Sequence, residues 1–127
     1  MTPFVKLGLY QPEIAPNTGN LIRLCANCGA RLELIHPLGF ELDDKRLRRA
    51  GLDYREFSQV LEHDKYTSFM SVSDRGRVFA CSTKGSVCHS DIRFEFGDTL
   101  LMGPETRGLP EEVRDDSAIE AVIRLPM

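Results

Sequence analysis

The chain has 127 residues, a net charge of −3 and a hydrophobic fraction of 42%, an ordinary composition for a globular protein that buries one core. It has neither an apolar stretch of the roughly eighteen residues that cross a bilayer nor an N-terminal secretory signal. We therefore expect a single domain over residues 1–127, located in the cytoplasm and without a membrane partner. The slightly acidic charge argues against a broad basic face for nucleic acid, so we expect any RNA contact to be local.

The first 35 residues predict a strand, a helix and a second strand. An apolar strand covers 5–10, and the proline-bounded loop 11–16 leads to a helix that Asn17 or Thr18 caps and Gly29 ends. A second strand over 32–35 completes a βαβ unit with a right-handed crossover. The residues at helical spacing that form the apolar stripe of the helix are Leu21, Ile22, Leu24, Cys25 and Cys28.

The rest of the chain alternates strands and helices less regularly. The predicted elements are a short basic helix opened by Asp43 and Asp44, a brief strand over 57–61, a helix over 65–72, a strand over 78–81, an alternating edge segment over 92–96, a buried strand over 99–102, a helix over 111–115 and a final strand over 121–125. This order predicts an α/β fold with a mostly parallel sheet and helices on both faces.

Two glycines and two prolines shape the loop 103–110, directly after the buried strand. Glycine and proline favour a sharp turn that a ligand or another backbone can approach closely. Ligands in open α/β sheets bind beyond the ends of such strands. A turn that only reverses the chain has the same composition, so the loop alone leaves both interpretations open.

The start of the first helix is the second candidate site. Asn17, Thr18, Gly19 and Asn20 place amides, a hydroxyl and a glycine at the positive end of the helix, where phosphate or ribose oxygens bind favourably. Arg23, one turn further on, can hold a phosphate or stabilise an anionic oxygen. A capping role explains one asparagine, but not two together with an arginine.

Two other patterns have a structural and a functional interpretation. Cys25 and Cys28 have the spacing of zinc and redox sites, but they lie late in a helix, and Cys81 and Cys88 are too widely separated for a second half-site. We expect buried thiols and no metal. The basic residues Lys45, Arg46, Arg48 and Arg49 either form the solvated face of a helix or neutralise RNA phosphates.

Four ordered blocks together carry a resemblance to a known family. They cover residues 17–25, 39–54, 83–85 and 103–108, the last with the sequence Gly-Pro-Glu-Thr-Arg-Gly. They closely resemble the SPOUT superfamily of knotted RNA methyltransferases, in particular its small bacterial branch that 2′-O-methylates the wobble nucleotide of tRNA. The resemblance extends from about Val5 to Met127.

The resemblance implies a homodimer that binds S-adenosylmethionine in loops at the carboxyl end of the sheet, within a trefoil knot. It implies methyl transfer to the ribose of a wobble cytidine or modified uridine, with Asn20 and Arg23 as catalytic residues. The residues implied to line the cofactor pocket are Cys81, Thr83, Gly103, Glu105, Gly108, Leu125 and Met127. Those implied to bind tRNA are Asn17, Lys45, Arg46, Arg48, Arg49 and Arg107.

The chemistry constrains two of these residues. Methyl transfer from a sulfonium is an in-line displacement, so much of the rate can come from positioning. Because a guanidinium is a reluctant base, we expect Arg23 to orient the hydroxyl electrostatically. Glu105 is either a general acid or base, or it holds its loop by accepting backbone donors. Arg107 either binds a substrate phosphate or pairs with Glu105.

Relatives in this branch continue beyond the equivalent of Met127 into a Ser/Asn-rich loop and a C-terminal helix that complete the pocket and the knot. We therefore expect the natural protein to be longer than 127 residues. A chain that truly ended at Met127 would instead be a non-catalytic RNA-binding or dimerisation module. A small hydrolase built around Glu105 is a third hypothesis, although no nucleophile, metal cluster or partner base accompanies that carboxylate.

Overall fold

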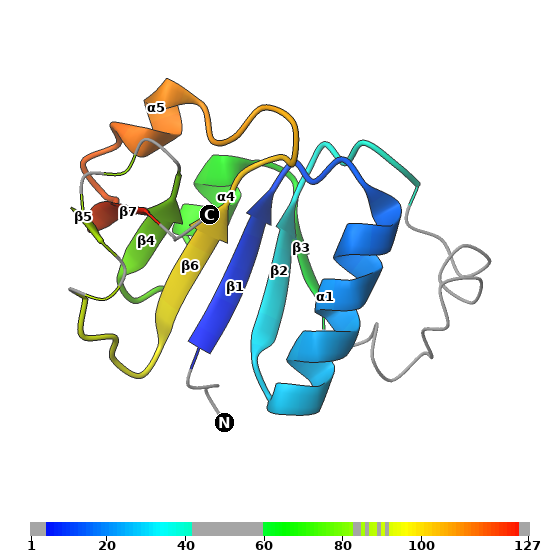
Figure 1. Cartoon of the computed structure of the whole chain (residues 1–127), viewed down its shortest axis with the longest axis horizontal. Helices are drawn as coiled ribbons and strands as arrows, with labels where there is room; N and C mark the ends of the chain where they lie inside the picture. The colour runs from blue at the N-terminus through cyan, green and yellow to red at the C-terminus, as the bar shows by residue number, and fades with distance from the viewer. Residues whose placement is uncertain are drawn as a thin grey trace.

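The computed structural model describes residues 5–41, 60–82, 85, 87, 88, 90 and 92–124. The described residues form a seven-stranded sheet in the order β3-β2-β1-β6-β4-β7-β5, and each strand pair in it is parallel (Figure 1). The elements are β1 (Val5–Tyr10), α1 (Ala15–Cys28), β2 (Arg31–Ile35), β3 (Leu61–His63), α4 (Tyr66–Met70), β4 (Val78–Cys81), β5 (Val87–Cys88), β6 (Asp98–Met102), α5 (Glu111–Arg114) and β7 (Ala121–Arg124). The predicted parallel α/β fold is confirmed.

Helices cover both faces of the sheet, as predicted. On one face Ile22 and Cys25 of α1 pack against Leu9 of β1 and against Leu32 and Leu34 of β2. The other face is covered by α4 and α5, whose buried Phe69 and Val113 belong to a cluster with Ile35, Val78, Ala80 and Leu101. Each central strand therefore contributes alternate residues to two separate cores.

Helix α1 begins earlier than predicted. Its N-cap is Ile14 and a proline, Pro16, lies in its first turn, so the prediction that Asn17 or Thr18 caps the helix is wrong. Proline fits there because its fixed φ is helical and its missing N–H would have no intrahelical partner. Ile14 provides no side-chain cap. The predicted end is confirmed, since Gly29 has the left-handed φ of 79° that favours glycine.

The buried stripe of α1 is narrower than predicted. Thr18, Ile22 and Cys25, at spacings of four and three residues, form its buried line. Leu24 is 58% exposed and Cys28 is also exposed, so their assignment to the apolar stripe is wrong. A helix that lies on a flat sheet buries only one side, and these two residues fall outside it.

Two strand predictions in the second half of the chain differ from the described structure. Of the strand predicted over 57–61, residues 57–59 lie outside the described residues, and the described strand β3 covers Leu61–His63, so it shares only Leu61 with the prediction. Residues 92–96 form no strand; Phe94 instead packs edge-on against Phe79 of β4, with the ring centroids 5.4 Å apart. The edge strand is β5, which pairs with β7. The alternating apolar residues at 92–96 pack across a face of the sheet, and such packing gives the same sequence pattern as an edge strand.

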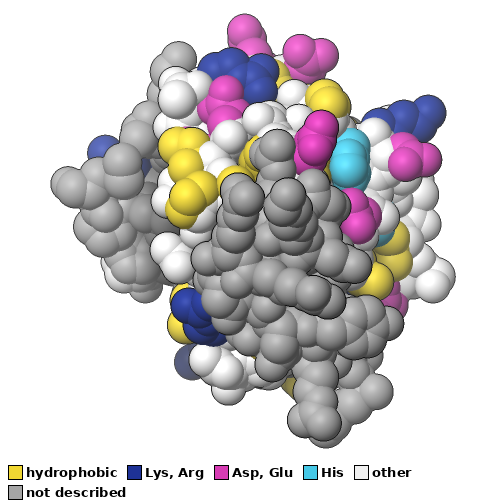
Figure 2. Space-filling model, turned by 90° about the vertical axis from the view of Figure 1, so that its right-hand side faces the viewer, with side chains coloured by type: hydrophobic (Ala, Val, Ile, Leu, Met, Phe, Trp, Pro, Cys, Tyr) yellow, Lys and Arg dark blue, Asp and Glu magenta, His cyan; other side chains and the backbone are white. Residues whose placement is uncertain are grey.

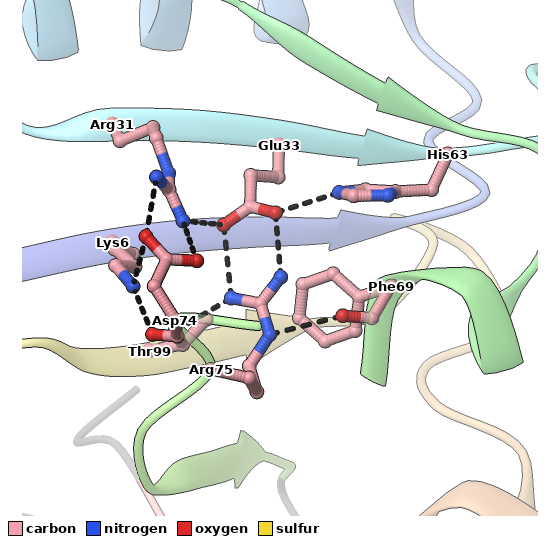
Figure 3. Close-up of polar contacts among 8 residues, drawn as sticks. All are labelled: Lys6, Arg31, Glu33, His63, Phe69, Asp74, Arg75 and Thr99. Atoms are coloured by element: carbon pink, nitrogen blue, oxygen red, sulfur yellow. Dashed lines mark hydrogen bonds and ion pairs between the residues drawn. The ribbon is translucent and has the colours of Figure 1, made fainter. Parts of the chain in front are cut away.

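A group of polar and charged side chains lies on the sheet face that α4 covers, with Lys6 and Glu33 fully buried at its centre and Asp74 at its exposed end (Figure 3). We call it the buried network; it comprises Lys6, Arg31, Glu33, His63, Asp74, Arg75 and Thr99. The Glu33 carboxylate is fully buried and accepts two hydrogen bonds from the Arg75 guanidinium, at 2.6 and 2.9 Å. His63 Nε2 lies 2.6 Å from Glu33 Oε1. Burial raises the pKa of Glu33, but the hydrogen bonds from Arg75 and His63 outweigh it, so that the pKa lies below its usual range.

The buried network also holds the segment between α4 and β4. Lys6, which is fully buried in β1, donates from Nζ to the Asp74 carbonyl oxygen at 2.8 Å. Arg75 donates from Nε to the Phe69 carbonyl oxygen at 3.0 Å, and its guanidinium lies 4.1 Å from the centre of the Phe69 ring. These contacts fix the end of α4 over the sheet. His63 therefore has a structural role.

Candidate functional site

The candidate site lies where β1 and β6 end. These two strands are parallel neighbours, with Leu9 paired to Met102, so the loops that follow them emerge at the same edge of the sheet. Figure 1 shows the chain after β1 and the chain after β6 meeting at this upper edge, close to the first turn of α1. The loop 103–110 is thereby brought to the start of α1, the helix that carries residues 17–23.

Glycine is required twice in the loop after β6. A Cβ on Gly103 would overlap the Leu109 backbone nitrogen and lie 2.5 Å from the Gly108 carbonyl carbon. Gly108 has a left-handed φ of 68°, and its N–H donates to the Pro104 carbonyl oxygen at 2.9 Å. The loop therefore folds tightly back on itself, and its shape depends on both glycines.

Four hydrogen bonds join this loop to the start of α1. The Glu105 carboxylate accepts the backbone N–H groups of Glu13 and Ile14, at 2.7 and 3.3 Å. The Glu13 carboxylate in turn accepts the backbone N–H and the hydroxyl of Thr106, at 3.0 and 2.6 Å. We call Glu13, Ile14, Glu105 and Thr106 the loop clamp. The Glu105 carboxylate holds the two residues that lead into α1, near the end of the helix where the dipole favours an anion.

Glu105 thus accepts backbone donors, one of the two roles that the sequence indicated. Arg107 pairs with Glu13, its Nε lying 3.5 Å from Glu13 Oε2, and not with Glu105, which was one of the two alternatives for this residue. The hydrogen bonds from Thr106 hold the pKa of the Glu13 carboxyl below its usual range, and Arg107 acts in the same direction. The side chain of Arg107 is 59% exposed and remains accessible to a ligand.

Sequence reasoning missed Glu13 and Thr106. Glu13 follows Pro12 in the loop directly after β1, and Thr106 lies inside the glycine loop. Their positions after two strand ends were visible in the sequence, but the pairing of β1 with β6 was not. Asn17 and Asn20 are exposed and Arg23 is half-buried on α1, within nine residues of Ile14. The clamp therefore fixes the helix that carries these three residues.

The other strand ends implied to bind the cofactor are also neighbours. Cys81 at the end of β4 pairs with Met102 of β6 on one side and with Ile123 of β7 on the other. Ser82 donates its N–H to the Ile123 carbonyl oxygen at 3.0 Å, and a Cβ on Gly85 would lie 2.5 Å from the Ile123 carbonyl carbon. The loop after β4 therefore lies directly against the backbone of β7, so backbone groups from three strand ends converge.

The backbone arrangement fits a nucleoside cofactor held by main-chain groups at the carboxyl edge of the sheet. Burial raises the pKa of the Cys81 thiol to about 11, so the thiol stays protonated at neutral pH. At Cys81 the groups suited to a cofactor contact are therefore those of the main chain. Thr83, Leu125 and Met127, also implied to line the pocket, lie outside the described residues.

The comparisons with known proteins agree with this geometry. The model of the SpoU rRNA Methylase family matches residues 5–127. The chain belongs to this family. It is 57% identical over 119 residues to a tRNA (cytidine(34)-2'-O)-methyltransferase of Aeromonas hydrophila, which covers 94% of this chain and 76% of that relative.

Solved structures of SpoU proteins share the fold. One, concerned with the 2-OH methylation of C/U34 on tRNA, superposes with a TM-score of 0.85 at 44% identity, covering 98% of this chain and 81% of the other. The SpoU methyltransferase AviRb from Streptomyces viridochromogenes, in complex with AdoMet, superposes with a TM-score of 0.78 at 19% identity. That match covers all of this chain and 52% of AviRb, and it bears on the fold alone.

The cysteines of this SpoU-family chain show no sign of a metal site in its described part. No three His, Cys, Asp or Glu side chains there are grouped to hold an ion. Cys25 and Cys81 are buried, as expected, and burial raises the pKa of the Cys25 thiol to about 11. The same expectation is wrong for Cys28, which is exposed, and for Cys88, which is half-buried.

The described surface carries charges of both signs. On the face shown in Figure 2, the described Lys and Arg side chains are scattered among Asp and Glu rather than gathered into one basic area. The basic residues expected to contact RNA, at 45, 46, 48 and 49, lie outside the described residues. Among the helices that the structure describes, none has the length and apolar character needed to span a membrane.

Proposed function

We propose that the protein is an S-adenosylmethionine-dependent tRNA methyltransferase that methylates the ribose 2′-hydroxyl of wobble nucleotide 34, a cytidine or modified uridine. One observation carries the proposal. The described residues of the family-specific blocks, on α1 and in the loops after β4 and β6, meet at one edge of a sheet. The relative at 57% identity has the corresponding activity in its name.

S-adenosylmethionine supplies an electrophilic methyl group on a sulfonium. In our proposal the residues that hold it are Cys81, Thr83, Gly103, Glu105, Gly108, Leu125 and Met127, chiefly through backbone groups. The Glu105 carboxylate is engaged with the Glu13 and Ile14 amides, so its contribution is to fix the shape of the loop. Gly103 and Gly108 give that loop the tight turn on which the backbone contacts depend.

On the substrate side, Arg23 orients the ribose hydroxyl and stabilises the developing negative charge, with Asn20 beside it on α1. A guanidinium remains protonated, so the hydroxyl proton leaves to another acceptor, such as an RNA phosphate. Asn17, Lys45, Arg46, Arg48, Arg49 and Arg107 bind the tRNA backbone in this proposal. Arg107 is suited to that role because it is exposed and its contacts with Glu13 and Gln11 are both long, at 3.5 Å.

The resemblance further supports a homodimer of single-domain subunits that contain a trefoil knot and act in the cytoplasm, where tRNA is modified. Size-exclusion chromatography with light scattering tests the dimer. A monomeric mass at micromolar concentration would contradict it.

Transfer of labelled methyl from S-adenosylmethionine to unmodified tRNA, with the modified nucleotide mapped, tests the function. We expect label at the ribose of nucleotide 34. Arg23→Lys should lose most of the turnover and keep cofactor binding, because lysine lacks the fixed fork of donors. Unchanged turnover would remove Arg23 from the mechanism. Calorimetry with the cofactor alone separates the enzyme from a non-catalytic RNA-binding module, which predicts no heat of binding.

A further inference from the structure

We propose that Glu13 and Thr106 are positioning residues for methyl transfer: the loop clamp sets the distance and angle between α1, which carries Asn17, Asn20 and Arg23, and the loop that binds the cofactor. This inference rests on the proposed function. Neither Glu13 nor Thr106 belongs to the sets of cofactor-binding, tRNA-binding or catalytic residues given above. Their role follows from the contacts between the two loops.

The contacts of the clamp are reciprocal. Glu13 contributes its backbone N–H to Glu105 and its carboxylate to Thr106. The hydrogen bonds therefore run in both directions between the two loops: Glu13 and Ile14 donate to Glu105, and Thr106 donates twice to Glu13. A single hydrogen bond would act as a hinge, whereas two opposed pairs resist both sliding and rotation of one loop against the other.

The clamp acts on the part of the molecule where the reacting groups would meet. Ile14 is the N-cap of α1, so the Glu105 carboxylate holds the residue that directly precedes the helix. Thr106 lies between Gly103 and Gly108, whose turn shapes the cofactor loop. Movement at the clamp would therefore displace Arg23 relative to the methyl donor without unfolding either element.

In-line displacement makes the reaction sensitive to such a displacement. The hydroxyl oxygen, methyl carbon and sulfur must be collinear, and a misplacement of about 1 Å can cost on the order of a hundredfold in rate. The clamp residues are exposed or half-exposed, so their hydrogen bonds add little to the stability of the fold. We therefore expect the clamp to influence turnover far more than folding.

The test measures kcat, the KM for tRNA and cofactor binding in matched variants. Glu13→Ala removes the acceptor for both Thr106 donors, and kcat should fall by at least about tenfold. Thr106→Val removes only the hydroxyl and should cost about three- to tenfold. In both variants the cofactor Kd and the KM for tRNA should stay within about threefold, since the groups that bind remain present.

Thr106→Ser restores the hydroxyl donor and should return kcat to within about twofold of the wild type. Thr67→Val, on exposed Thr67 of α4, is the matched control and should leave kcat unchanged. Circular dichroism and melting temperature establish that each variant is folded; if Glu13→Ala is not, Thr106→Val and its serine rescue carry the test.

The outcomes separate this inference from the proposed function. If the wild type does not methylate tRNA, the proposed function fails and this inference fails with it. If the wild type is active and Thr106→Val keeps full kcat, the clamp has no positioning role while the proposed function stands. A loss that serine does not reverse, or one that appears in KM or the cofactor Kd alone, would also overturn the inference.

Discussion

The buried network and the loop clamp, together with Arg107 beside the clamp, use the same three kinds of side chain in opposite surroundings: a carboxylate, a hydroxyl and a guanidinium. In the network, the Glu33 carboxylate and the Thr99 hydroxyl accept from the Arg75 guanidinium. At the clamp, Glu13 accepts from Thr106 and pairs with Arg107. The carboxylate and guanidinium are 0% and 5% exposed in the network, against 26% and 59% at the clamp. We infer that burial decides whether a carboxylate, a hydroxyl and a guanidinium in contact stabilise the fold or adjust the geometry of a site.

The largest expected effect is on the buried side of this comparison. Glu33→Gln leaves the Arg75 guanidinium buried without a full counter-charge, and breaking a buried pair in this way costs about 3–5 kcal/mol. Urea denaturation measures the loss. Glu112→Gln, on exposed Glu112 of α5, serves as the control. A loss below about 1 kcal/mol would mean that the network contributes little to folding.

On the functional side of the comparison, Gly103→Ala should disrupt the loop after β6. A Cβ cannot fit against the Leu109 nitrogen, so the loop must open, and cofactor binding should weaken at least about tenfold by calorimetry. The comparison is Gly29→Ala, at the end of α1. There the strain of a left-handed alanine should cost about 1 kcal/mol of stability and leave cofactor affinity intact. Equal cofactor affinity in both variants would contradict the role of the loop.

Acid should weaken the buried network while leaving the protein unaffected near neutral pH. The hydrogen bond from Arg31 lowers the pKa of Asp74 from 3.8 to about 2. The stabilisation from a lowered carboxyl pKa is complete above the unfolded value and is lost as the pH falls from about 4 towards 2. Melting temperatures measured from pH 5 to pH 2 should fall less steeply in Asp74→Asn than in the wild type. Parallel curves would show that the ion pair does not contribute.

The smallest effect on stability is expected at Arg107. Its contact with Glu13 is long and exposed, so Arg107→Ala should shift the melting temperature by less than about 2 °C. Binding to tRNA should weaken, with the salt dependence of log K reduced by about one unit if a phosphate contact is lost. An unchanged salt dependence would show that Arg107 contacts no phosphate.

The sequence was sufficient where the pattern is local. The strand over 78–81 is a continuous apolar run, and the strand over 5–10 is apolar apart from Lys6 and Gly8; both have the predicted bounds. The start of α1 was placed too late because Asn17 and Thr18 suit an N-cap, whereas Pro16 already fits the first helical turn. At 92–96 the alternating residues cover a sheet face without pairing, a difference that periodicity does not detect.

The site was only partly predictable, for a reason of distance along the chain. The resemblance led to the blocks around Asn17 and Gly103. Glu13 and Thr106 are 93 residues apart, and nothing in either neighbourhood indicates the other. β1 pairs with its sequence neighbour β2 along one edge, but the contact depends on the pairing of its other edge with the distant β6, and such strand order is not encoded in local periodicity.

That strand order has a consequence for synthesis on the ribosome. The first 35 residues contain β1, α1 and β2, which can pair as soon as they emerge. The other edge of β1 must wait for Asp98–Met102, so its N–H and C=O groups face solvent while more than sixty further residues are translated. The nascent chain therefore passes through a stage with an open parallel edge, slow to close and prone to pairing with other chains.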